Sequence, residues 1–169
     1  GIIGSSGSGK STLSEIITGL RIPTKGKISI NGNELYKNYE CSQILKNNSS
    51  IIPQESFLRD KSIKENILSY RKYNKINYFR AIKESLVNEF SETKPNGDTF
   101  KVGENGKLLS GGQKQRINLA RGIYSKKRII IFDESTSSLD PKKEQKILKN
   151  IKKISKDSII ILITHNHNL

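Results

Sequence analysis

Near its start the chain reads Gly4-Ser5-Ser6-Gly7-Ser8-Gly9-Lys10-Ser11, which meets the full phosphate-loop pattern G-x-x-x-x-G-K-[ST]. In this pattern backbone N–H groups surround phosphate oxygens, and a helix beginning at Lys10 adds the positive end of its dipole. Lys10 then reaches the outer phosphates and the Ser11 hydroxyl holds Mg²⁺. A flexible linker is the alternative, but a linker has no need of Lys-Ser followed by an apolar helix. The run therefore predicts a nucleoside triphosphate site.

Length and composition indicate one domain with a sizeable core, since the chain has 169 residues. It holds no Met, and only Ile2 and Ile3 stand for the strand expected before the loop, so we expect a longer natural chain. Cys41 is the single cysteine, which excludes an intrachain disulfide and fits a reducing compartment. No apolar run approaches 18 residues, so we predict no membrane-crossing helix within this stretch.

The formal net charge of +14 raises the question of an anionic partner. Against nucleic acid, the lysines are spread along the chain, and aromatic residues do not alternate with them as base stacking requires. We therefore interpret the charge as a solvated surface and expect no nucleic acid. Anionic lipid headgroups and an acidic protein partner remain alternatives.

The first half of the chain mixes both kinds of element. Apolar residues at helical spacing follow the loop, and Gly19 fits a helix C-cap. Alternation over 27–30 and the turn Asn31-Gly32 predict a small antiparallel element. Residues 49–54 predict a short buried strand with Gln54 at its tip. Further on, Ser62 and Glu65 predict a capping box, and Ala81, Ile82, Leu86 and Phe90 predict one amphipathic helix.

The second half alternates helix and strand after a polar loop over 94–112. We expect a helix around 117–124, a strand over 128–132, a helix opened by Asp140-Pro141, and a strand over 158–163. Strands that alternate with helices imply a mainly parallel sheet covered on both faces. The predicted fold class is α/β, a P-loop NTPase core with a mainly parallel sheet, a small antiparallel β element and an inserted α-helical subdomain at about 56–126. We expect the whole chain, 1–169, to form one domain.

Polar residues follow several predicted strands directly. Ligands of parallel α/β sheets bind beyond the carboxyl ends of the strands, so Gln54, Asp133, Glu134 and His165 are expected beside the phosphate loop. Asp133 can serve Mg²⁺. Consecutive residues at a strand end point to opposite sides, so we expect Glu134 to face the attacking water while Asp133 faces the metal. A pair of solvated turn acids is the plainer interpretation, and the phosphate loop weighs against it.

A second anion site is predicted at Leu109-Ser110-Gly111-Gly112-Gln113. Two glycines before a helix leave free backbone donors at its N-terminus. A helix cap in a surface loop would explain the same residues, but two phosphate-suited helix ends in one chain call for a common explanation.

That segment resembles the signature motif of ATP-binding-cassette (ABC) ATPases. The resemblance spans essentially the whole chain, and its motifs follow in the family's order: Walker A (Gly4 to Ser11), Q-loop (Gln54), signature (Leu109 to Gln113), Walker B with its glutamate (Asp133, Glu134), D-loop (Ser138 to Asp140) and switch histidine (His165). In this family two cassettes face each other head to tail, and each ATP lies between one Walker A and the partner's signature.

The resemblance implies a role for each motif residue. It implies phosphate contacts from the loop, namely Gly4, Ser5, Ser6, Gly7, Ser8, Gly9, Lys10, Ser11 and Thr12, and Mg²⁺ contacts from Ser11, Gln54 and Asp133. Catalysis would fall to Glu134 as general base, assisted by His165, Gln54 and Lys10. The ATP of the other cassette would meet Ser110, Gly111, Gly112 and Gln113, with Asp140 communicating across the interface. The family's adenine-stacking aromatic residue lies upstream of Walker A.

Thr99 to Gly106 resembles the X-loop of ABC exporters, and residues 54–67 resemble their Q-loop region. The resemblance implies ATP-driven export, transmembrane domains fused upstream, and a place on the cytoplasmic face of the inner membrane. Phe57, Leu58 and Glu104 are the candidate contacts with those domains. A soluble ABC-type ATPase acting on ribosomes or nucleic acid, a DNA-repair ATPase and a basic scaffold without turnover are the alternatives. The short interval between Lys10 and Ser110 leaves no room for the DNA-repair class's coiled coil.

Overall fold

A four-stranded parallel sheet forms the centre of the computed structural model, which describes residues 1–5, 7–30, 32–34, 39–54, 57–136, 138–154 and 156–164. The strands are β1 (Ile2–Ile3), β4 (Ser49–Ile52), β5 (Ile129–Asp133) and β6 (Ile159–Thr164), in the order β1-β6-β5-β4. The first four residues of β5 are buried, because helices cover both faces of the sheet. The predicted parallel sheet is confirmed.

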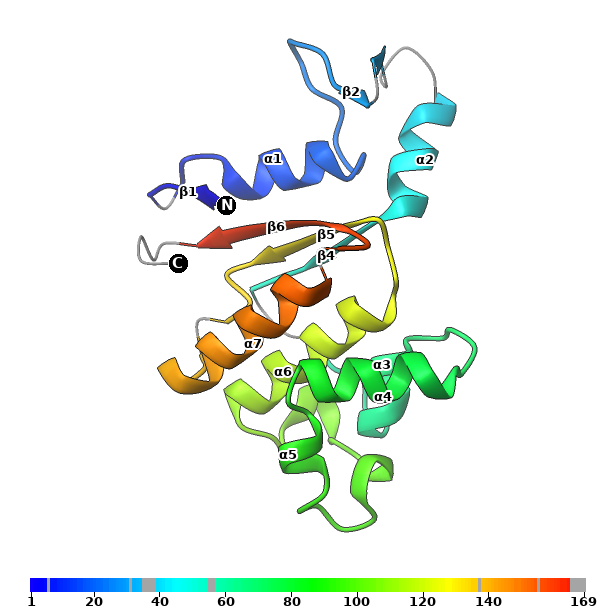
Figure 1. Cartoon of the computed structure of the whole chain (residues 1–169), viewed down its shortest axis with the longest axis vertical. Helices are drawn as coiled ribbons and strands as arrows, with labels where there is room; N and C mark the ends of the chain where they lie inside the picture. The colour runs from blue at the N-terminus through cyan, green and yellow to red at the C-terminus, as the bar shows by residue number, and fades with distance from the viewer. Residues whose placement is uncertain are drawn as a thin grey trace.

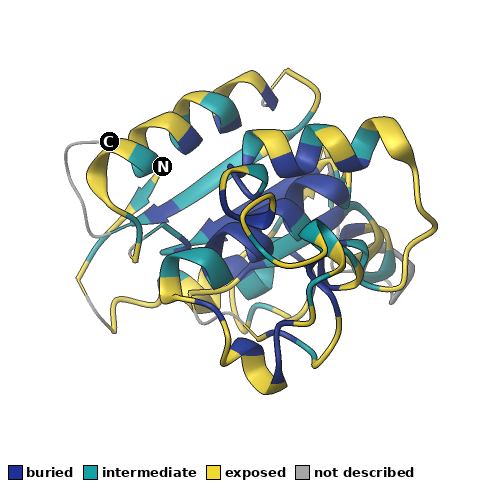
Figure 2. Cartoon of the chain, turned by 90° about the horizontal axis from the view of Figure 1, so that it is seen from below, coloured by how far each residue is buried: buried dark blue, intermediate teal, exposed yellow. Residues whose placement is uncertain are grey.

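Helices lie on both sides of the sheet (Figure 1), and alternate residues of β5 pack toward opposite helical layers. Ile129 and Ile131 pack with residues of α1 (Lys10–Ile17) and α2 (Tyr39–Asn48). Ile130 and Phe132 pack with residues of α6 (Gly111–Tyr124) and α7 (Pro141–Ile154). Figure 2 shows buried residues on the sheet and on the inner faces of the helices, and exposed residues on their outer faces. The alternation of side chains along the strand therefore determines which helical layer each residue of β5 contacts.

The small antiparallel element is confirmed as a hairpin of β2 (Ser29–Ile30) and β3 (Asn33–Glu34). Gly32 lies between the strands with φ of 81°, a left-handed value that glycine adopts without strain. Asn31 and Leu35, also assigned to this element, lie outside the described residues.

A group of helices packs around an apolar core of its own, and one of them, α6, also packs against the sheet (Figure 1). It contains α3 (Ile63–Leu68), α4 (Lys75–Glu84), α5 (Asn88–Ser91) and α6, with the 3₁₀ turns η1 (Gly97–Thr99) and η2 (Glu104–Gly106) inside the predicted loop. The capping box of α3 is confirmed, since Ser62 and Glu65 bond reciprocally. A helical subdomain over about 56–126 stays a prediction.

The single amphipathic helix predicted from Ala81 to Phe90 is wrong. α4 ends at Glu84, Leu86 adopts a left-handed φ of 60°, and Phe90 belongs to the short helix α5. The Ser85 hydroxyl donates to the carbonyl of Ala81, which helps to end α4. Leu86 and Phe90 are both buried because the chain turns between them, and not because they share one helical face.

The start of α7 and the end of α1 follow the sequence prediction, whereas α6 begins at Gly111, inside the predicted loop over 94–112. α7 begins at Pro141, and the carboxylate of Asp140 accepts from the backbone N–H of Lys143 at 3.0 Å. Gly19 follows α1 with φ of 74°, and a Cβ there would lie 2.9 Å from the carbonyl oxygen of Ser42. The C-cap of α1 therefore needs glycine for conformation and for space.

Candidate nucleotide site

The phosphate loop joins β1 to the first turn of α1. Gly7 and Gly9 have φ of 77° and 89°, and Gly9 is the N-cap residue of the helix. The ammonium group of Lys10 donates to the carbonyl oxygens of Gly4 and Ser5 at 2.9 and 2.8 Å. These two bonds hold the charge over the loop, at the end where the helix dipole favours anions. Ser6 lies outside the described residues.

Two carboxylates from the end of β5 meet partners from other elements here. The hydroxyl of Ser11 donates to Oδ2 of Asp133 at 3.0 Å, and the side-chain amide of Gln54 donates to Oε2 of Glu134 at 2.9 Å. The phosphate-loop hollow, about 350 Å³, is lined by Gly7, Gly9, Lys10, Ser11, Thr12, Gln54, Asp133 and Glu134. The structure thus brings the predicted strand-end residues to one place, except His165, which lies outside the described residues.

The expectation that Asp133 and Glu134 point to opposite sides is wrong. Asp133 is the last residue of β5, whereas Glu134 turns out of the strand with a left-handed φ of 45°. Its backbone N–H donates to the carbonyl oxygen of Ile163 at 3.0 Å. Because of this turn both side chains line the same hollow, so one site has both acids available.

The donor set suits Mg²⁺. Hydroxyl, carboxylate and amide oxygens of Ser11, Asp133 and Gln54 are the hard ligands this ion binds. Within the part of the chain that the structure describes, no three His, Cys, Asp or Glu residues gather as a metal cluster. Such a site would complete its coordination with phosphate oxygens and water, as magnesium sites in triphosphate enzymes do.

A second hollow, about 510 Å³, lies at the N-terminus of α6 and has different walls. We call it the signature hollow; it is lined by Ser110, Gly111, Gly112, Arg116, Ser138, Leu139, Asp140 and Lys143. Ser110 caps α6, accepting from the N–H of Gln113 at 3.3 Å while Gln113 Oε1 accepts from the N–H of Ser110 at 3.0 Å. The predicted signature residues and Asp140 thus come together.

Close packing fixes the shape of the signature hollow. A Cβ on Gly112 would lie 3.1 Å from the carbonyl oxygen of Ser138, so the segment before α7 approaches the helix at its glycine. Side-chain and backbone hydrogen bonds from Lys143 lower the pKa of Asp140 below its ordinary value. The Asp140 carboxylate therefore keeps its negative charge at neutral pH.

Some lining residues escaped the sequence prediction. Arg116 and Lys143 line the signature hollow but carried no predicted role. Lys143 follows the capping acid Asp140 by three residues, a spacing that signals contact in a first helical turn. The predicted contact residue Leu58 is fully buried in the helical core, so that assignment is wrong, whereas Phe57 and Glu104 are exposed.

Fold and loop together define a nucleoside triphosphatase of the phosphate-loop class. Residues 1–137 match the family profile described as ABC transporter. Over 166 residues, the chain is 38% identical to the alpha-hemolysin translocation ATP-binding protein HlyB of Escherichia coli O157:H7 and to the leukotoxin translocation ATP-binding protein LktB of a Pasteurella haemolytica-like species. The chain belongs to the ABC transporter family and is an ATPase domain of that family.

A solved structure agrees with this assignment. A bacterial Atm1-family ABC exporter with ATP bound matches 97% of this chain at a TM-score of 0.87 and 33% identity. The matches to HlyB and LktB include 98% of this chain. The chain spans only 23% of the length of HlyB and of LktB, and 28% of that exporter chain. Across the residues that are described, no helix combines the length and the hydropathy needed to cross a bilayer.

Proposed function

We propose that this domain hydrolyses ATP to drive export of a substrate across a membrane. One observation carries the proposal: the chain presents two separate helix N-termini suited to phosphate, each at its own hollow. A single bound triphosphate needs only one of them. Two copies arranged head to tail would use both, with each ATP between the phosphate loop of one copy and the signature hollow of the other.

The phosphate-loop hollow would hold the triphosphate and its metal. Lys10, the loop 4–9 and Thr12 would hold the phosphates. Ser11, Asp133 and Gln54 would hold Mg²⁺, which neutralises charge on the transferred phosphoryl group. Glu134, positioned by its 2.9 Å bond from Gln54, would polarise the attacking water, and His165 would contact the outer phosphate. From the second copy, residues 110–113 would complete the site, and Asp140 would communicate across the interface.

Transmembrane domains are the proposed partners. HlyB and LktB are named as translocation proteins, and the matched solved structure is of an exporter. We therefore place the domain on the cytoplasmic face of the cell membrane, attached to transmembrane helices that precede it in one polypeptide. The exposed Phe57 and Glu104 are candidates to contact them.

Glu134→Gln tests the proposed chemistry, because the amide keeps the shape of the side chain but cannot act as a base. ATP hydrolysis by the intact protein should fall by roughly 10²-fold or more, while binding of a fluorescent ATP analogue is retained. Glu92→Gln is the matched control, since Glu92 is exposed and away from both hollows. Wild-type hydrolysis by Glu134→Gln would contradict the assignment of the base.

Membrane attachment has its own test. Membranes of cells that make the intact protein are washed with alkaline carbonate, and a peptide of this domain is followed by mass spectrometry. The proposal predicts retention in the washed membrane. Release into the soluble fraction would instead support a soluble ABC-type ATPase.

A further inference from the structure

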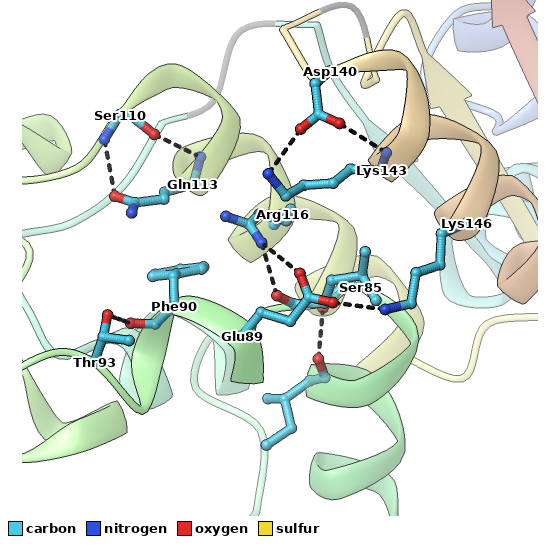
Figure 3. A network of polar contacts seen from close by, with 12 residues as sticks. Ser85, Glu89, Phe90, Thr93, Ser110, Gln113, Arg116, Asp140, Lys143 and Lys146 are labelled. Atoms are coloured by element: carbon cyan, nitrogen blue, oxygen red, sulfur yellow. Dashed lines mark hydrogen bonds and ion pairs between the residues drawn. The ribbon is translucent and has the colours of Figure 1, made fainter.

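Arg116 is a buried cation on α6, the helix capped by Ser110. Its side chain is 8% exposed, and Nη1 donates to the carbonyl oxygen of Leu86 at 3.0 Å (Figure 3). The guanidinium carbon lies 4.7 Å from the ring centroid of Phe90. Both contacts belong to the corner between α4 and α5, where Leu86 is left-handed. Arg116 thus connects α6 to the sharp turn between α4 and α5.

Glu89 shares its carboxylate between two cations. One oxygen lies 3.7 Å from Nη1 of Arg116, and the other lies 2.7 Å from the ammonium nitrogen of Lys146 on α7 (Figure 3). Burial lowers the pKa of Arg116, and the charges of Glu89 and Asp140 oppose that shift. A desolvated cation of this kind depends on its anionic partner. The network therefore runs from α6 through α5 to α7.

A second connection joins the same two helices nearer to the signature hollow. The backbone N–H of Ser138 donates to Oε1 of Gln115 at 3.0 Å, and Gly112 packs against the carbonyl of Ser138. The walls of the hollow are thus held together by neutral contacts at Gly112 and Gln115 and by the ionic network at Arg116. α6 supplies the N–H groups of one wall, and α7 begins directly after Asp140 in the other.

We propose that Glu89 and Arg116 are positioning residues for the signature hollow, setting the direction of the α6 N-terminus relative to Asp140. Glu89 acts through Arg116 and touches no phosphate. This rests on the proposed function, because it presumes that the signature hollow receives the outer phosphate of an ATP held by a second copy. The guanidinium contacts Leu86 and Glu89 through Nη1 while its planar group lies over the ring of Phe90. A lysine ammonium group has no planar face to stack on that ring.

The test compares variants of the network in the intact protein. We expect Glu89→Gln and Arg116→Lys each to lower maximal ATP turnover by roughly tenfold or more, because each change weakens the contact of a buried cation with its anionic partner. The Hill coefficient for ATP should fall toward one, while affinity for a fluorescent ATP analogue at the phosphate-loop hollow stays at the wild-type value. Glu92→Gln and Lys149→Met, exposed neighbours on the same segments, serve as matched controls.

A charge exchange separates positioning from simple attachment of α5 to α7. Glu89→Lys combined with Lys146→Glu keeps an attractive pair between these helices but sets a cation against Arg116. Positioning through Arg116 predicts that turnover stays low although the melting temperature recovers. Full recovery of turnover in the exchanged variant would overturn the proposal.

Failure of this proposal is distinguishable from failure of the proposed function. Wild-type turnover in Glu89→Gln together with strong loss in Glu134→Gln would reject only the positioning role. An equal loss of analogue binding and turnover in Glu89→Gln would also reject it, because it would indicate general destabilisation. No loss in Glu134→Gln would instead contradict the base assigned in the proposed function, whatever the result for Glu89→Gln.

Discussion

Ser110 has a structural role as a helix cap and a place in the signature hollow, and a substitution can separate the two. Its hydroxyl caps α6, and its position on the wall of the signature hollow places it where the ATP of a second copy would bind. The same hydroxyl thus stabilises the first turn of α6 and borders an anion site. The size of the side chain at this residue should therefore affect ATP turnover, whereas its hydrogen bonding should affect the stability of the first turn of α6.

Ser110→Arg should abolish ATP turnover while a fluorescent ATP analogue still binds one copy with unchanged affinity. The long side chain fills the signature hollow, whereas the phosphate-loop hollow has none of the same residues. Ser110→Thr keeps a capping hydroxyl and should retain far more turnover. Loss of analogue binding to the single copy would place Ser110 outside a site shared between copies.

The sequence predicted the positions of site residues correctly where a motif determines the geometry. It failed where the backbone takes an unusual turn. Lys10, Ser11, Gln54 and Asp133 lie together because strand ends and a loop pattern require it. The left-handed Glu134 was missed, since this conformation is uncommon for a residue other than glycine and depends on a bond to Ile163 that only the folded sheet supplies.

At the scale of elements, the packing of α6 on β4 depends on Gly122. A Cβ at this position would lie 2.4 Å from Cδ1 and 2.6 Å from Cγ1 of Ile52. Ile52 is buried in the core between the sheet and this helix. The helix therefore approaches the strand more closely than any larger residue would allow.

Gly122→Ala should lower the free energy of unfolding by about 1–3 kcal/mol, the usual range for overpacking a core. Thermal or denaturant unfolding measures the change. Ile52→Val removes the methyl group nearest to the new Cβ, so the double variant should be more stable than the sum of the two single effects predicts. Strict additivity would show that the contact with Ile52 is not the cause.

The capping box of α3 should make stability depend on pH. Ser62 donates from its N–H and hydroxyl to Oε2 of Glu65 at 2.9 and 2.7 Å, and these bonds lower the pKa of Glu65 below its ordinary value. A lowered folded pKa means that the stabilisation is present above the unfolded pKa and is lost as pH falls through the folded value. Wild type should therefore melt higher than Glu65→Gln at pH 7, and this difference should shrink below about pH 4. A difference that stays constant with pH would contradict the charge effect.

Element prediction was most successful for strands and capped helices. Apolar runs located β5 and β6 to within one or two residues, and cap residues located the starts of α3 and α7. The break between α4 and α5 was missed because Leu86 and Phe90 fit one helical stripe, although each is buried by a different element. Periodicity alone cannot distinguish one long helix from two that share a core.

At the scale of the whole molecule, the two hollows are walled by different residues and are each suited to phosphate. Both hollows are used in binding ATP only if two copies face each other, with the phosphate loop of one chain opposite the signature hollow of the other. The central claim is therefore that the complete ATP site is shared between two copies.

Complementation between two defective copies tests this claim most directly. Lys10→Met disables the phosphate-loop hollow and Ser110→Arg disables the signature hollow, so two identical copies of either variant contain no complete site. The two variants are produced together with different affinity tags, and ATP hydrolysis by the purified mixed pair is measured. A shared site predicts turnover in the mixed pair that neither variant shows alone, because one complete site forms between them. A mixed pair as inactive as each variant alone would contradict the account.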